Sequence, residues 1–182
     1  MDASRTAAGM TLVELVTVIA IAAIVLMLGA PAFGKLKAQV QTRTAEGQVT
    51  RALQHARHAA IMRGTRVLMC PSVDGKSCTS GFAWHSGWII ALDADHDGKP
   101  DTGTPVLAMT GAVASNLRLI TSVGREKIVF HPDGSAPGSN TTFTICQGTQ
   151  ALGATVIVSN VGRVRSAAAN AAQLEKCIAT AP

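Results

Sequence analysis

The chain has 182 residues, of which 47% are hydrophobic, and it carries 16 Lys and Arg against 11 Asp and Glu, a formal net charge of +5 at pH 7. This length fits one small domain beside a terminal apolar segment and excludes a series of independent cores. The basic balance favours a polyanionic partner, with a solvated basic face as the alternative.

The N-terminus joins a short polar segment, ending at Gly9, to an apolar run that is unbroken from Leu15 to Leu28. The stretch from Met10 to Phe33 is long enough to span a bilayer, for which about 20 residues suffice. It is not a secretory signal peptide, because the one plausible cleavage position, after Gly9, precedes the apolar segment. Glu14 lies inside this segment, where a carboxylate is costly, so we expect it to have a partner or a function.

Gly9 followed by Met10-Thr-Leu-Val-Glu14 resembles the start of type IV pilins and type II secretion pseudopilins. The resemblance implies that residues 1–9 are a leader, which a prepilin peptidase removes after Gly9. Met10 would then be the new, N-methylated terminus. In a filament, Glu14 would pair with the terminal amino group of a neighbouring subunit.

We therefore expect a transmembrane and polymerisation helix over 10–33 and its amphipathic continuation over 34–64. Gly29 and Pro31 fall where pilins have a helix-weakening pair, and Pro removes a helical hydrogen bond, so a kink or a melted turn is expected near Ala30. Gly64 is a plausible stop. The continuation carries apolar residues at helical spacing, which predict a face packed on the head: Leu36, Val40, Ala45, Val49, Leu53, Ala56 and Ala60.

The head, residues 65–182, is expected to be rich in β-structure, because short apolar runs alternate there with Gly, Pro, Asp and Asn. A helix followed by an antiparallel sheet is an α+β, pilin-like arrangement. The predicted strands are Arg66 to Cys70, Gly87 to Asp93, Leu117 to Val123, Lys127 to His131, Thr142 to Gln147, Thr155 to Ser159 and Arg163 to Ser166.

Four cysteines in an exported chain indicate disulfides, for which three connectivities are possible. Cys70 and Cys78 flank a polar, turn-rich segment, which favours a local bridge between them. Cys146 would then join Cys177 and tie the C-terminal tail to a core strand. A metal site built from the four cysteines is disfavoured, because the chain has no Cys-x-x-Cys.

The head also resembles the GspH and FimT branch of the pilin superfamily. The resemblance is carried by Val67-Leu-Met-Cys-Pro, by Gly87-Trp-Ile-Ile and by Ile128-Val-Phe-His-Pro-Asp-Gly134. It implies that the stalk helix carries two packed β-sheets. The stretch from Ser166 to Pro182 departs from what this branch leads us to expect.

The FimT proteins of this branch carry a Gly-Arg-x-Arg motif that contacts DNA, and here it reads Gly162-Arg163-Val164-Arg165. On an extended segment both arginines point to one face and Val164 points to the other. Gly162 could adopt a positive φ and bring the backbone close to a phosphate. Because Arg suits bidentate phosphate contacts, we expect weak, salt-sensitive and sequence-tolerant binding of double-stranded DNA. Auxiliary contacts are proposed for Lys127, Arg125 and Arg118.

Other patterns carry less weight. Asp93, Asp95, Asp97 and Asp101 have the spacing of the first half of a calcium loop, but Thr104 replaces its final Glu, so a polar turn is favoured and calcium stays an alternative. His55 and His58 are expected on a polar helix face rather than at a metal. The core is expected to include Trp84, Trp88 and Phe130.

The usual signatures of hydrolases, metalloproteases and phosphate loops are absent from the sequence, so we expect neither an enzyme nor a cofactor. The hypothesis is a minor type IV pilin that binds extracellular DNA for uptake in natural transformation. It would start as a single-pass inner-membrane protein with its head in the periplasm and then join other pilins in a surface pilus. The alternative is a structural minor pilin or pseudopilin of a filament tip without DNA binding.

Overall fold

The structure is a computed structural model that describes residues 9–147 and 150–180, with the side chains of 28–32 and 150–152 also outside the description. Residues 1–8 of the predicted leader therefore lie outside the described residues. The chain divides into two compact units, Met1–Lys37 and Ala38–Pro182. One helix, α1 (Leu12–Arg63), contributes to both units.

The first part of α1 presents apolar side chains to its surroundings. Leu12, Ile21 and Met27 are 77%, 62% and 77% exposed. Among the residues that the structure describes, no helix combines the length and apolarity that crossing a membrane requires. The helix is continuous through position 30, so the backbone does not melt where the sequence favoured a melted turn.

The second part of α1 supplies one wall of the core. Buried residues recur every three or four positions at Ala38, Thr42, Ala45 and Val49, and the stripe continues through Leu53, Ala56 and Ala60. The predicted stripe is thus correct from Ala45 onward. It is wrong for Leu36 and Val40, both 55% exposed, because they lie two positions out of phase with Ala38 and Thr42.

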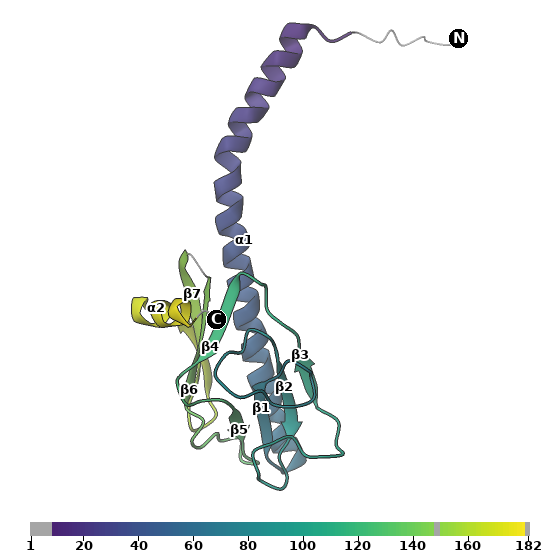
Figure 1. The fold of residues 1–182 in the computed structure, drawn as a ribbon, viewed down its shortest axis with the longest axis vertical. Helices are drawn as coiled ribbons and strands as arrows, with labels where there is room; N and C mark the ends of the chain where they lie inside the picture. The colour runs from purple at the N-terminus through teal and green to yellow at the C-terminus, as the bar shows by residue number, and fades with distance from the viewer. Residues whose placement is uncertain (1–8, 148–149, 181–182) are drawn as a thin grey trace, which may run out of the picture. The chain divides into compact units, whose positions relative to one another are not determined.

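Gly64 ends the helix with a φ of +62°, the left-handed conformation expected after a helix C-terminus. After Gly64, the described residues form eight strands in two antiparallel sheets (Figure 1), which confirms the α+β class. All seven predicted strands are present, although one begins at Gln150 instead of Thr155.

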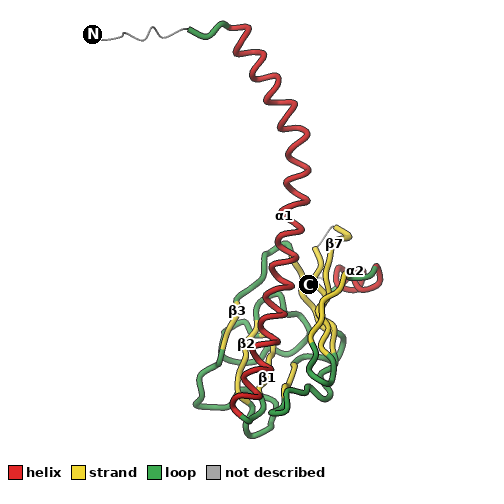
Figure 2. The backbone as a smooth tube through the Cα atoms, turned by 180° about the vertical axis from the view of Figure 1, so that it is seen from behind, coloured by secondary structure: helices red, strands yellow, loops and turns green. Residues whose placement is uncertain are grey.

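The first sheet, sheet A, has the strand order β3-β2-β1-β5. Long loops connect its strands (Figure 2), and one of its two three-residue edge strands, β3, was not predicted. Its strands are β1 (Val67–Pro71), β2 (Trp88–Leu92), β3 (Ala108–Thr110) and β5 (Ile128–Phe130).

The second sheet, sheet B, has the order β4-β6-β7-β8. Its strands are β4 (Leu117–Thr121), β6 (Thr141–Gln147), β7 (Gln150–Val158) and β8 (Val164–Ala168). A second helix, α2 (Ala171–Ala179), packs on the outer face of this sheet through Leu174 and Cys177, beside Ile120 and Cys146 (Figure 1).

The main core lies between α1 and the inner faces of both sheets. It includes Trp84, Trp88 and Phe130, each at most 1% exposed, as the sequence predicts. The alanines of α1 that face this core have short side chains. Large side chains from the sheets, among them Phe143 and Leu119, fill the space between the layers.

Candidate nucleic-acid interface

The Gly-Arg-x-Arg motif forms the turn between β7 and β8 and the first residues of β8. Gly162 N donates to the Ser159 carbonyl at 2.8 Å, and Ser159 N donates to the Arg163 carbonyl at 3.0 Å. Gly162 has a φ of +75°, which closes this short hairpin as a type I turn with a left-handed glycine does. The turn therefore fixes where β8, and with it the arginine pair, begins.

Gly162 is buried, and its Cα faces the backbone of another turn. A Cβ there would overlap the Gly134 carbonyl and would come within 3.1 Å of Arg57 Nε. The two turns are joined by a hydrogen bond from Ala136 N to the Asn160 carbonyl, 2.8 Å. Gly162 is thus a packing residue, and its conformation has a physical reason that needs no approach to phosphate.

Arg57 connects this pair of turns to α1. Its Nε donates to the Gly134 carbonyl at 2.9 Å across 77 residues of sequence. Gly134 also has a positive φ, +78°, and a Cβ there would lie 2.8 Å from Ile61 Cδ1. The stalk helix, the turn at Gly134 and the hairpin at Gly162 therefore form one rigid support beneath the arginines.

The side chains of the motif alternate between solvent and the core, as the sequence predicts. Val164 is half-buried against the main core, whereas Arg163 and Arg165 are exposed. Within the described part of the chain, the hydrogen bonds of Arg163 use its backbone alone, which leaves the guanidinium free. Two positions apart on a strand, the arginine Cα atoms are about 6.7 Å apart.

The auxiliary basic residues do not gather at this pair. Arg118 lies on β4, at the opposite edge of sheet B from β8, and pairs in register with Cys146. Arg125 Nη1 donates to the Gly138 carbonyl at 2.6 Å, and Lys127 Nζ donates to the Gly98 carbonyl at 2.6 Å. Each of these two side chains thus holds a loop in place.

His85 lies close enough to Arg118 to be influenced by its charge. His85 is partly buried, and its Nδ1 is without a hydrogen-bond partner in the described part of the molecule. Burial lowers the pKa of His85 below its usual value, and the positive charge of Arg118 lowers that pKa further. The ring is therefore neutral at pH 7.

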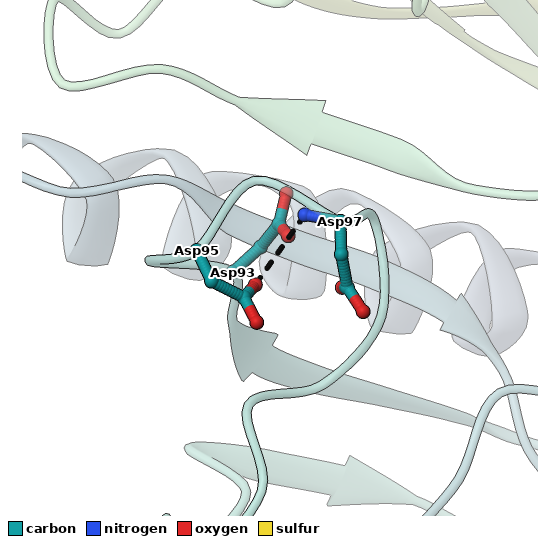
Figure 3. Close-up of side chains that lie close together, drawn as sticks. All are labelled: Asp93, Asp95 and Asp97. Carbon is teal, nitrogen blue, oxygen red and sulfur yellow. Dashed lines mark hydrogen bonds between the residues drawn. The ribbon is translucent and has the colours of Figure 1, made fainter.

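The aspartates of the predicted calcium loop are only partly brought together (Figure 3). Carboxylate oxygens of Asp93, Asp95 and Asp97 all lie within 4.8 Å of one another. Asp101 instead accepts hydrogen bonds from Ala94 N at 3.0 and 3.2 Å. Asp93 accepts from the Gly98 amide at 2.8 Å, and Asp95 accepts from the Asp97 amide at 3.3 Å. These bonds build a polar turn whose three clustered carboxylates could hold a divalent cation.

Both predicted disulfides are present, Cys70–Cys78 and Cys146–Cys177. The first closes a loop ordered by Asp74, whose carboxylate accepts hydrogen bonds from the Ser77 hydroxyl at 2.6 Å and from the Ser77 amide at 2.8 Å. Those bonds, with one from the Lys76 amide, hold the pKa of Asp74 well below its usual range. The second disulfide fastens α2 to β6.

His55 and His58 are both exposed on α1, as expected, and line a shallow hollow of about 310 Å³ together with Met62. Sequence reasoning missed α2, although Asn170 and Gln173 form a capping box that signals a helix start. It also missed Arg57, for which the sequence offers no signal, because its partner is distant in the chain.

Residues 47–162 match the model of the family described as type II transport protein GspH. Among solved structures, the fold is similar to the type IV minor pilin FimU of Pseudomonas aeruginosa, with a TM-score of 0.57 and 23% identity over 71% of this chain and 92% of that one. It is also similar to the minor pseudopilin EpsH from the type 2 secretion system of Vibrio cholerae, with a TM-score of 0.50 and 13% identity over 70% of this chain and 97% of that one. No curated protein matches the sequence.

The matched segment begins within α1 and ends at Gly162, so it includes most of both sheets and the hairpin turn. The chain belongs to the GspH family and has the α+β fold of a minor pilin or pseudopilin.

Proposed function

We propose that this protein is a minor pilin whose head binds extracellular double-stranded DNA during natural transformation. The observation that carries the proposal is the exposed pair of Arg163, directly before β8, and Arg165, on β8, held to one side by the inward-facing Val164. Each guanidinium can make a bidentate contact with a phosphate, which an ammonium group cannot do. Phosphate contacts alone position a protein without reading bases, so binding is sequence-tolerant.

The packed turns next to Arg163 and Arg165 favour their contact with DNA phosphates. The buried turn at Gly162, the Gly134 carbonyl and Arg57 fix the strand on which the arginines stand. A fixed backbone lowers the entropy that DNA binding must overcome, since only the two side chains need to be ordered. In this account Gly162 acts by shaping the strand, and Arg163 and Arg165 act by contacting phosphate.

The N-terminal segment is proposed to serve processing and assembly. A prepilin peptidase cuts after Gly9 and methylates Met10, and residues 10–33 hold the subunit in the inner membrane with its head in the periplasm. Glu14 then pairs with the terminal amino group of a neighbouring pilin as the subunit enters a surface pilus. Glu14 is exposed in the first turn of α1, where the Glu14 amide donates to Thr11 Oγ1 at 3.3 Å.

The competing function is a structural subunit of a pilus or secretion filament tip with no nucleic-acid ligand. The observation that favours it is the family itself, whose description names a type II transport protein. Both functions require the same fold and the same filament contacts. They differ only in whether the arginine pair carries affinity for DNA.

The test is a DNA-binding assay on the full chain in neutral detergent, with a fluorescent 30-base-pair duplex. The double variant Arg163→Ala, Arg165→Ala should lose most of the affinity. The control removes the same charge from exposed positions of α1, as Arg43→Ala, Arg51→Ala, and should bind nearly as wild type does. Equal affinity of the two double variants would favour the structural subunit.

A further inference from the structure

A groove of about 620 Å³ runs over the outer face of sheet B. Its floor includes Thr142 and Thr144, from β6. One wall is α2, with Lys176, and its C-cap Thr180, and the other is the loop after β4, with Ser122 and Val123. None of the groove-lining residues that the structure describes is acidic.

The polar part of this lining fits an anion, whereas Phe82, Ile120 and Val123 are apolar. Lys176 is exposed, and hydroxyl groups stand on the floor and on both walls. Ser122 Oγ accepts from Thr142 N at 3.1 Å and so keeps its own proton to donate to an anion, whereas the Thr180 hydroxyl donates its proton to the Lys176 carbonyl at 2.6 Å. Hydroxyl and ammonium groups are the side chains that commonly meet phosphate oxygens.

The wall formed by α2 is fixed rather than loosely docked. The Cys146–Cys177 disulfide joins it to β6, and Leu174 is 9% exposed against the sheet. At its start, Asn170 and Gln173 satisfy one another's backbone amides in a capping box. Lys176 therefore projects from a helix whose position is set by covalent, apolar and polar contacts together.

The groove continues the surface that carries the arginine pair. Thr142 pairs in register with Ile157, and Ile157 pairs with Arg165, so the three side chains lie in one row on the same face. Adjacent strands are about 4.8 Å apart, which places Arg165 about 10 Å from Thr142. One DNA strand advances about 3.4 Å per nucleotide along the axis, so three nucleotides cover this distance.

We infer that the backbone of DNA bound at Arg163 and Arg165 continues across Ile157 and Thr142 into this groove, where Lys176 contacts a further phosphate. The inference rests on the proposed function and deepens it, since it gives the bound DNA a direction across sheet B. It commits to DNA as the occupant because the charged side chains of the arginine pair and of the groove lining, Arg163, Arg165 and Lys176, are all positive.

The experiment measures the affinity of the full chain in neutral detergent for a 30-base-pair duplex between 50 and 200 mM salt. Each phosphate contact contributes about 0.9 to the slope of log affinity against log salt. Lys176→Gln should therefore lower the slope by about 0.9, whereas Lys99→Gln, which removes an exposed lysine from the Asp-rich loop, should leave it unchanged. A non-reducing mass map must find Cys146 still joined to Cys177 in the Lys176 variant.

The outcomes separate this inference from the function on which it rests. If Lys176→Gln and Lys99→Gln give the same slope while the Arg163→Ala, Arg165→Ala variant loses binding, the groove is not on the DNA path and the proposed function stands. If the wild-type protein does not bind the duplex at 50 mM salt, both are overturned.

Discussion

Replacing Gly162 by Ala tests whether this glycine packs the hairpin or merely permits a turn. The residue has a φ of +75°, and a left-handed conformation costs a residue with a Cβ about 1–2 kcal/mol. The added methyl group would also overlap the Gly134 carbonyl and approach Arg57. Such overpacking costs about 1–3 kcal/mol. The expected total loss in the free energy of unfolding is therefore about 2–5 kcal/mol.

A matched control isolates the packing contribution. Gly138 has nearly the same φ, +71°, but a Cβ there would meet nothing within 4 Å. Gly138→Ala should therefore show the backbone effect alone, about 1–2 kcal/mol. The difference between the two variants, about 1–3 kcal/mol, measures the close approach of the two turns.

Thermal unfolding of the unit Ala38–Pro182, followed by circular dichroism, is the assay, because this compact unit contains the whole main core and both disulfides. For a unit of this size, 1 kcal/mol shifts Tm by about 2–4 °C. Gly162→Ala should lower Tm by about 4–20 °C and Gly138→Ala by about 2–8 °C. Equal shifts in the two variants would refute the packing role of Gly162.

Three other predictions concern the stability and assembly of the protein. Burial lowers the folded-state pKa of His85, so below about pH 6.5 the unfolded chain binds more protons than the folded protein does. The free energy of unfolding should therefore decrease as the pH is lowered from 7 to 5, and His85→Asn should make this decrease smaller in urea titrations. An unchanged pH dependence in the variant would contradict the assignment. Replacing both Cys146 and Cys177 by Ser removes a disulfide between residues 31 positions apart in the sequence. The free energy of unfolding, measured in urea, should fall by about 3–4 kcal/mol. An unchanged free energy would show that fastening α2 to the sheet contributes nothing to stability. Glu14→Ala should still be cut after Gly9 but should enter filaments poorly in a pilus preparation, and normal incorporation would exclude the proposed pairing of Glu14.

Much of the fold could be predicted because local patterns dominate it. The strands of the head are short apolar runs bounded by turn residues, and the hairpin at Gly162 shows both period-two alternation and a turn glycine. The third strand was missed because Ala108–Thr110 owes its conformation to pairing with β2 rather than to its own residues. The start of the buried stripe on α1 was misplaced because Leu36 and Val40 have apolar side chains but are exposed.

The candidate interface also has a part that the sequence predicts and a part that it does not. The direction of Arg163 and Arg165 follows from strand periodicity alone, so the sequence was enough to predict it. The contact of Arg57 with Gly134, and the groove between α2 and the loop after β4, depend on segments far apart in the chain. Single-sequence patterns carry no information about such contacts, and only the folded chain brings these residues together.

The salt dependence of duplex binding by the arginine-pair variant tests the central claim most directly. Affinity of the full chain should fall linearly in log salt, and Arg163→Ala, Arg165→Ala should lower the slope by about 1.8, since each arginine neutralises one phosphate. The same loss of charge at Arg43 and Arg51 should leave the slope unchanged. A slope that both double variants share with the wild type would contradict the account, because DNA would then bind elsewhere on the protein.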